Sequence, residues 1–173
     1  MRSYSYRTGA SRILFGRGTF KQVPQVVEDC GAVRALVLST EFQRPMAEIA
    51  VGHLGDAVAG VFSGAVMHTP TDVTDTALAY CESIKADSIV YIGGGSTTGL
   101  GKALAHRTGL PHIVAPTTYA GSEVTDILGQ TEDGLRTTIR AGSILPTAVI
   151  YDPRLTDGLP LKMSIVSGLN AMA

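Results

Sequence analysis

Short apolar runs of strand length alternate along this chain with segments whose apolar residues recur at helical spacing. Buried strands are predicted at residues 35–38, 58–62, 88–92, 112–115 and 148–151. Helices are predicted between them, at about residues 20–30, 46–54, 71–85 and 96–108. This alternation is typical of an α/β fold in which a parallel sheet carries helices on its faces.

Three stretches depart from that pattern. Residues 4–15 are expected to form one or two short strands. Residues 123–147 are polar, rich in threonine and centred on TEDG, which predicts a β-hairpin laid over the sheet. The segment LPLKMSIVSGLNAMA has helical spacing, and the chain ends inside it without a stop signal. Such a helix exposes an apolar face that favours association, formed by Ile165, Val166, Leu169 and Met172.

Composition narrows the class of partner. The 173 residues fit one domain, and acidic and basic side chains nearly cancel to a formal net charge of -1. Nucleic acid and anionic membranes are therefore not expected as partners, and we expect a small-molecule partner instead. The N-terminus lacks a signal-peptide core, and no run of about 18 apolar residues occurs. We expect a cytoplasmic protein in which Cys30 and Cys81 are reduced thiols and not zinc ligands.

The candidate chemistry centres on residues 93–98, GGGSTT, which join a buried strand to a helix. Glycines here let backbone N–H groups approach an anion, and the helix dipole adds a partial positive charge. The hydroxyls of Ser96, Thr97 and Thr98 are expected to cap the helix and to donate to phosphate oxygens. This pattern predicts a pyrophosphate site, with an ordinary glycine-rich turn as the alternative.

A second loop, PTTYAGSE at residues 116–123, follows the next strand and supplies further hydroxyls. In a parallel sheet both loops emerge at the same carboxyl edge, where ligands bind. The glycine-rich turn does not belong to a nucleoside triphosphatase, because Lys102 lies two turns into the helix and no serine or threonine follows it.

Four segments, GGGSTTGLGK, PTTYAGSEVT, IYDPRLT and SGLNAMA, resemble successive motifs of the iron-containing alcohol dehydrogenase superfamily, most closely its maleylacetate reductase branch. The resemblance implies a Rossmann-like N-terminal domain that binds NADH or NADPH, a helical C-terminal domain and an active site between them. Residues 1–160 would be the dinucleotide-binding domain, and residues 161–173 the start of a helical domain otherwise absent from this chain. The catalytic residues stay unknown, because the resemblance places them in that helical domain.

Two departures from the superfamily pattern bear on metal binding. Metal-dependent members carry GGGSxxDxxK, and here Gly99 replaces the aspartate. Those members also begin a DAxxH motif with a metal-binding aspartate, and here Asn170 stands in its place. A neutral amide is a poor ligand for a divalent cation. The motif's histidine would follow Ala173, so the resemblance implies an enzyme without a metal.

The resemblance also identifies residues that would contact the cofactor. Ser39 and Thr40 stand where an acidic residue would bind the adenosine ribose, so their neutrality leaves room for a 2′-phosphate. Tyr119 replaces a smaller residue and either shapes the nicotinamide side or is a buried scaffold residue. The expected cofactor-binding residues are Ser39, Thr69, Gly93, Gly94, Gly95, Ser96, Thr97, Thr98, Thr117, Thr118, Tyr119 and Ser122.

Histidines and arginines carry weaker signals. His53, His106 and His112 lie in predicted helices or strands, where hydrogen-bonded or solvated histidine is more common than ligation. His68 is expected at a loop edge. Arg136 and Arg140 lie on the predicted hairpin, where the family often has a lysine near the nucleotide, or they are surface residues.

The function that the resemblance implies is NAD(P)H-dependent reduction of the dicarboxylate maleylacetate to 3-oxoadipate, in aromatic-compound degradation, by a homodimeric oxidoreductase. One alternative is a metal-dependent alcohol or glycerol dehydrogenase, against which Asn170 argues. Another alternative is a nucleotide-binding fragment without catalysis of its own. In that case the isolated chain would be inactive.

Overall fold

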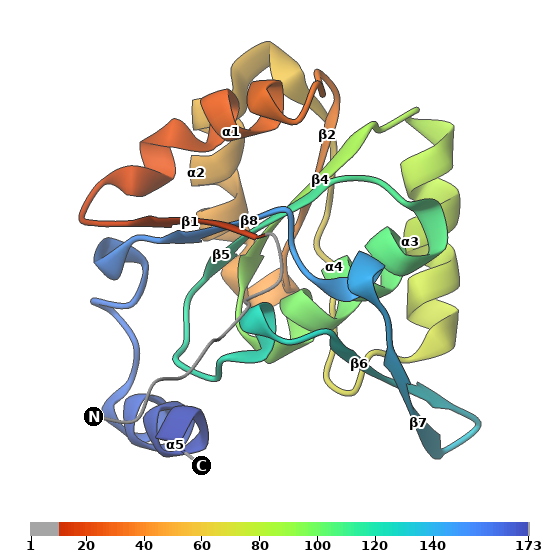
Figure 1. Cartoon of the computed structure of the whole chain (residues 1–173), viewed down its shortest axis with the longest axis vertical. Helices are drawn as coiled ribbons and strands as arrows, with labels where there is room; N and C mark the ends of the chain where they lie inside the picture. The colour runs from red at the N-terminus through yellow and green to blue at the C-terminus, as the bar shows by residue number, and fades with distance from the viewer. Residues whose placement is uncertain (1–10, 173) are drawn as a thin grey trace, which may run out of the picture.

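A six-stranded parallel sheet forms the centre of the protein in the computed structural model, which describes residues 11–172 (Figure 1). The strands lie in the order β1 (Arg12–Phe15), β8 (Ala148–Tyr151), β5 (His112–Pro116), β4 (Ser88–Gly93), β2 (Ala35–Leu38) and β3 (Val58–Phe62). Every neighbouring pair is parallel. The strands predicted after residue 30 are confirmed, and the predicted Rossmann-like sheet with them. Of the strands predicted in residues 4–15, β1 is present, and residues 4–10 lie outside the described residues.

Helices cover both faces of the sheet. One face carries α1 (Val23–Asp29) and α2 (Arg44–Leu54), and the other carries α3 (Thr71–Ser83) and α4 (Gly95–Thr108). Short 3-10 turns link the elements: η1 (Thr19–Gln22), η2 (Glu41–Gln43), η3 (Gly55–Ala57), η4 (Ser122–Val124), η5 (Gly142–Ile144) and η6 (Pro153–Leu155).

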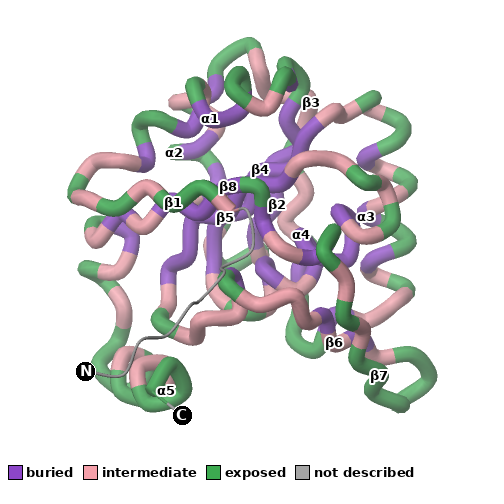
Figure 2. The backbone as a smooth tube through the Cα atoms, in the orientation of Figure 1, coloured by how far each residue is buried: buried purple, intermediate pink, exposed green. Residues whose placement is uncertain are grey.

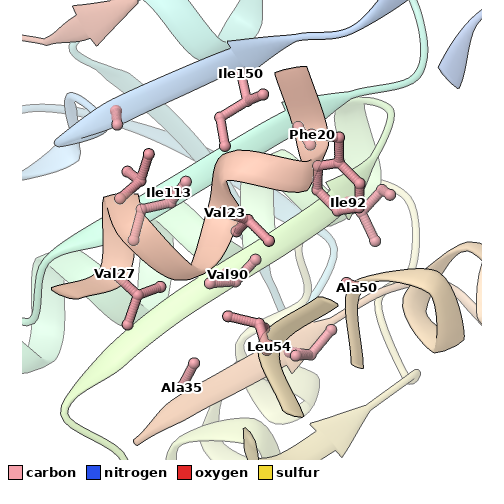
Figure 3. Close-up of a cluster of buried hydrophobic side chains, with 14 of the residues drawn as sticks. Phe20, Val23, Val27, Ala35, Ala50, Leu54, Val90, Ile92, Ile113 and Ile150 are labelled. Atoms are coloured by element: carbon pink, nitrogen blue, oxygen red, sulfur yellow. The ribbon is translucent and has the colours of Figure 1, made fainter. Parts of the chain in front are cut away.

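The core lies on the two faces of the central strands, because successive side chains of a strand point in opposite directions. In β4, Val90 and Ile92 pack beneath α1 and α2, and Ile89 and Tyr91 face α3 and α4. Figure 3 shows the first of these clusters, with side chains from both helices against the strands. Burial on both faces explains why the strands are continuous apolar runs in the sequence.

The connections diverge between β2 and β4, which are neighbours in the sheet. The chain leaves β2 toward α2 on one face and leaves β4 toward α4 on the other. Parallel sheets bind ligands in the crevice that such a divergence opens at the carboxyl ends of the strands. The fold therefore places the glycine-rich turn after β4 at this crevice.

Helix α4 is held close against β4. Gly101 faces the fully buried ring of Tyr91, and a Cβ at residue 101 would overlap that ring. The Tyr91 hydroxyl donates to His112 Nδ1 at 3.1 Å, and His112 Nε2 donates to the carbonyl oxygen of Leu145 at 2.9 Å. Burial lowers the pKa of His112 to about 4. This histidine is a hydrogen-bonded core residue, as its strand context predicted.

The predicted hairpin is present as β6 (Ile127–Glu132) and β7 (Leu135–Arg140), paired antiparallel. Its predicted place over the sheet is wrong, because β6 packs against the helices α3 and α4. The last helix, α5 (Leu161–Met172), lies apart from the sheet, and most of its length is exposed (Figure 2). Its predicted apolar face is exposed at Ile165, Val166, Leu169 and Met172. None of the helices within residues 11–172 has the length and apolar composition needed to cross a membrane.

We predict that acid weakens the fold through His112. Its pKa is 6.5 when unfolded and about 4 when folded, so the unfolded chain binds the extra proton between these values. The contribution of neutral His112 to the free energy of unfolding is complete above pH 6.5 and is lost as pH falls toward 4. The loss amounts to at most about 3 kcal/mol. Urea denaturation of wild type and His112→Gln across this range measures it. If the free energy of unfolding had the same pH dependence in the two proteins, the acid effect could not be assigned to His112.

Candidate functional site

The glycine-rich turn presents bare backbone at the start of a long helix. Strand β4 ends at Gly93, Gly94 is the N-cap, and α4 begins at Gly95. A Cβ on Gly93 would overlap Thr97 Oγ1, so this position requires glycine. At Gly95, by contrast, no heavy atom lies within 4 Å of the place a Cβ would take. Gly95 and Ser96 also line the surface grooves described below, so the first turn of α4 is accessible at the end where the helix dipole favours an anion.

The hydroxyls of the first helical turn differ in where they lie. Within residues 11–172 no side chain caps α4, so the capping role expected of residues 96–98 is not found, while donation to phosphate oxygens stays a prediction. Thr97 and Thr98 are buried, because their positions on the helix turn them toward the protein interior. Only Ser96 lines the surface grooves described below. Thr97 Oγ1 has no hydrogen-bond partner within residues 11–172.

Two grooves meet at this turn and share Gly95 and Ser96 in their walls. The first, which we call the apolar groove, has a volume of about 560 Å³ and is lined by Thr40, Phe42, Gln43, Pro45, Met46, Gly94, Thr117, Thr118, Leu155, Gly158, Leu159, Pro160 and Met163. The second, the polar groove, has a volume of about 420 Å³ and is lined by Met67, His68, Thr69, Gly99, Lys102, Ala120, Ser122, Ile127, Leu128, Gly129, Arg136 and Asn170.

The loop after β2 contributes Thr40 and not Ser39 to the apolar groove. Ser39 is fully buried, and its hydroxyl donates to Ser63 Oγ at 3.0 Å. Gln43, which the sequence gave no reason to select, joins two walls of this groove. Its backbone N–H donates to Thr40 Oγ1 at 3.2 Å, and its side-chain amide donates to Thr117 Oγ1 at 2.8 Å.

The PTTYAGSE loop is held by Lys102 of α4, whose side chain is almost completely buried. Its ammonium group donates to the carbonyl oxygens of Ser122, Thr125 at 2.8 Å and Ile127 at 3.0 Å, and to Thr125 Oγ1 at 3.0 Å. Burial lowers the pKa of Lys102 to about 8, which leaves it charged at neutral pH. The only signal in the sequence was its helical spacing from Gly95 and Gly99, which places all three on one side of α4.

The loop before α3 also reaches the polar groove, through two residues with left-handed backbone. His68 has φ 67° and Thr69 has φ 48°, values that are rare for residues other than glycine. The side chain of His68 is exposed, and Thr69 is 6% exposed. Both line the polar groove, so the predicted loop position of His68 agrees with the structure, and the contact of Thr69 with a cofactor stays a prediction.

The other residues considered in the sequence analysis differ in their position relative to the two grooves. Tyr119 is 44% exposed, so it is not a buried scaffold residue, and it lines neither groove. Arg140 pairs with Asp126 at 3.0 Å, and Arg136 lines the polar groove. Asn170 of α5 donates its side-chain amide to the carbonyl oxygen of Ala120 at 3.3 Å, which links the last helix to the PTTYAGSE loop.

The remaining histidines and both cysteines serve the scaffold. His53 packs edge-on against Phe20, and His106 is hydrogen-bonded to Ser143. Cys30 and Cys81 are free thiols, and burial raises the pKa of each. In the part of the chain that the structure describes, no three histidine, cysteine, aspartate or glutamate side chains are grouped to hold a metal ion.

Comparison with known proteins gives a consistent set of matches. The chain matches the iron-containing alcohol dehydrogenase family over residues 10–153. It is 55% identical to the maleylacetate reductase of Rhizobium sp. (strain MTP-10005) over 173 residues, which is 100% of this chain and 49% of that protein. The crystal structure of maleylacetate reductase from Agrobacterium tumefaciens is similar at a TM-score of 0.94 and 53% identity, covering 99% of this chain and 49% of that one.

A more distant structure shares the fold. Sulfoacetaldehyde reductase from Bifidobacterium kashiwanohense, solved in complex with NAD+, has a TM-score of 0.89 at 24% identity and covers 98% of this chain and 51% of that one. The chain spans about half the length of the curated relatives it matches.

We predict that Lys102→Met loosens the PTTYAGSE loop. Methionine fills similar space but leaves three carbonyl oxygens without the donor that holds them, which should lower the free energy of unfolding by about 2–4 kcal/mol. Hydrogen exchange should accelerate in residues 122–127 more than in α4. Lys21→Met, at an exposed lysine, is the matched control and should change neither quantity. Unchanged exchange in residues 122–127 would contradict the role given to Lys102.

Proposed function

Because the chain belongs to the iron-containing alcohol dehydrogenase family, we propose that it is the nucleotide-binding part of a maleylacetate reductase that uses NADH or NADPH. The observation that carries the proposal is the pair of grooves that meet at Gly95 and Ser96. A dinucleotide has the same plan, with two nucleosides joined by a diphosphate.

The turn fits the diphosphate by its chemistry. Gly95 leaves the N-terminus of α4 open, and backbone N–H groups with the helix dipole bind phosphate without a lysine or arginine. Thr118 approaches Gly94 so closely that its methyl carbon lies 3.0 Å from the place of a Cβ on Gly94, which keeps the turn narrow. We infer that the diphosphate lies against residues 94–96.

The linings of the two grooves differ, and this difference suggests which half of the cofactor each groove binds. The apolar groove offers Met46, Leu159 and Met163 to a flat base, and it includes Thr40 after β2. Sheets of this type bind the adenosine ribose at such a position. Adenosine is therefore assigned to the apolar groove and nicotinamide to the polar groove. The cofactor supplies the hydride for the reaction.

The substrate is proposed to approach the polar groove. Hydride transfer from NADH or NADPH to the olefinic bond of maleylacetate, which is conjugated to its ketone, gives an enolate, and a proton from solvent converts the enolate to 3-oxoadipate. A dicarboxylate substrate needs cations or hydrogen-bond donors, and Arg136 at this groove has no carboxylate partner within residues 11–172. The other catalytic groups are expected in the half of the relatives' length that this chain does not match.

Neutral side chains determine two further parts of the proposal. Thr40 and Gln43 carry no charge where a carboxylate would repel a 2′-phosphate, so both NADH and NADPH are expected to bind. Asn170 offers an amide where a metal-dependent enzyme needs a carboxylate, so the reaction is proposed to be independent of metal. Activity of a longer form that required added zinc or iron would support a metal-dependent alcohol or glycerol dehydrogenase instead.

The remaining features of the proposal concern organisation. We propose a cytoplasmic homodimer in which residues 1–160 form the dinucleotide-binding domain and α5 begins the next domain. The exposed apolar face of α5 supports a boundary at this position, because such a face is usually covered by another part of a protein.

We predict that Gly95→Asp abolishes dinucleotide binding while Gly95→Asn weakens it less. Both side chains enter open space, so both variants should fold. The aspartate adds a negative charge beside the diphosphate, which should weaken binding about tenfold or more relative to asparagine. Titration with NADH and NADPH, followed by reduced-nicotinamide fluorescence, measures this difference, and melting temperatures confirm folding. A folded wild type that binds neither nucleotide, or equal binding by the two variants, would overturn the diphosphate assignment.

A further inference from the structure

The side chain of Gln43 crosses the carboxyl end of β4. Gln43 is the last residue of η2, after β2, and its amide reaches Thr117, which follows β5. Strand β4 lies between β2 and β5 in the sheet, so the side chain passes over the last residue of β4, Gly93. A Cβ on Gly93 would lie 2.7 Å from Gln43 Oε1 and overlap it. Gln43 therefore spans the crevice between the two loops in space that a side chain at residue 93 would take.

Hydrogen bonds with Thr40 fix the direction in which the Gln43 amide faces. Thr40 Oγ1 accepts from the backbone N–H of Gln43 at 3.2 Å, and the Thr40 hydroxyl donates to Gln43 Oε1 at 3.5 Å. The amide oxygen is turned toward Thr40, which leaves the amide nitrogen to face Thr117 Oγ1 at 2.8 Å. Because an amide nitrogen only donates, the Thr117 oxygen is the acceptor in this bond.

The Thr117 hydroxyl keeps its own proton to donate. The bond from Gln43 is the one hydrogen bond that this hydroxyl makes to residues 11–172, although Thr117 is only 2% exposed. A hydroxyl that accepts from an N–H directs its proton away from that N–H. Thr117 lines the apolar groove together with Gly94 and Gly95, so an acceptor that enters the groove can receive this proton. Buried donors normally have an acceptor, and a ligand oxygen would supply it.

We propose that Gln43 is a positioning residue that sets the direction of the Thr117 hydroxyl, so that this hydroxyl donates to a phosphate oxygen in the adenosine half of the dinucleotide. An ionised phosphate oxygen fits because it can only accept, and because the diphosphate is assigned to the turn at residues 94–96. Gln43 acts through Thr117 and needs no contact with the ligand. The inference rests on the proposed function, since it needs the diphosphate to lie at the start of α4.

Two substitutions of Gln43 separate its polarity from its size. Gln43→Met keeps a side chain of similar length and removes the donor, which should weaken NADH binding by the whole chain roughly three- to tenfold. Gln43→Glu puts an acceptor in the donor's place, so the Thr117 proton turns away from the groove and a negative charge is added. It should bind NADH about tenfold or more weakly than Gln43→Met does. Reduced-nicotinamide fluorescence measures both losses, and ADP, which lacks the nicotinamide half, should lose affinity by the same factors.

A double variant tests whether Gln43 acts through Thr117. Thr117→Val removes the hydroxyl and should weaken NADH binding about as much as Gln43→Met, while Thr117→Ser keeps the hydroxyl and should bind within about twofold of wild type. In Gln43→Met/Thr117→Val no hydroxyl is left to direct, so NADH should bind about as it does to Thr117→Val alone. Gln22→Met is the matched control and should bind as wild type does, since Gln22 is exposed and lines neither groove. Melting temperatures confirm that each variant is folded.

The outcomes separate this inference from the proposed function. If wild type binds NADH and Gly95→Asp does not, but Gln43→Met binds as tightly as wild type, the role of Gln43 is overturned and the cofactor site stands. Wild-type affinity in Gln43→Glu would mean that the amide accepts from Thr117, which overturns the proposed direction. Losses from Gln43→Met and Thr117→Val that add in the double variant, or a loss for NADH without one for ADP, would also overturn it. If the folded wild type binds no dinucleotide, the proposed function fails, and this inference fails with it.

Discussion

The buried ammonium group of Lys102 fixes the two sides of the site relative to each other. It carries its charge out of water, and the loss of hydration is offset by four oxygen acceptors, three of them backbone carbonyls. The carboxylates of Glu123 and Asp126 favour its charged form, although burial is the larger influence on its pKa. Since the same helix provides the N–H groups at Gly95 and the ammonium at Lys102, the PTTYAGSE loop cannot shift without breaking these bonds.

This use of Lys102 decides what kind of anion site the crevice contains. Its donors are committed to the loop, and Glu123, also buried, accepts from the Tyr151 hydroxyl at 2.8 Å. The charged groups of Lys102 and Glu123 therefore hold the walls, and the proposed diphosphate position has only backbone N–H groups, the helix dipole and neutral hydroxyls around it. A site of this kind binds through fixed dipoles, which need no rearrangement when the ligand arrives. The divergence of the chain between β2 and β4 makes the space for it.

The sequence predicted the elements of this arrangement better than the directions of its side chains. Parallel strands buried on both faces are visible as apolar runs, and the carboxyl ends of β4 and β5 were therefore identified with their loops. The sequence did not show which of several adjacent hydroxyls faces the groove. In α4 this depends on which side of the helix each residue after Gly95 occupies, and after β2 it depends on where the strand ends. For this reason Thr97 and Ser39 were selected although their hydroxyls face the interior.

Two other features had little or no signal in the sequence. The roles of Gln43 and Lys102 depend on contacts between loops that are distant along the chain. The left-handed backbone at Thr69 is held by hydrogen bonds from Thr131 of the hairpin to the carbonyl oxygens of His68 and Thr69, and it runs against the intrinsic preference of threonine, so local propensity gives no indication of it. The resemblance to a family could indicate that this loop lies near the nucleotide, but only coordinates show how it is held.

The place of β1 in the sheet has a consequence for the order in which the protein is made. Arg12 pairs with Ala148, so β1, the earliest described strand along the chain, is joined to β8, the latest strand of the sheet. The neighbouring strands β3, β2 and β4 can pair while later residues are still being synthesised, whereas β1 must wait for β8. Asp152, just after β8, then fastens the turn that follows β1 by accepting from the N–H groups of Gly18 at 2.9 Å and Phe20 at 3.2 Å. Contacts this distant along the chain form slowly, and completion of the sheet edge is therefore a late event of folding after translation.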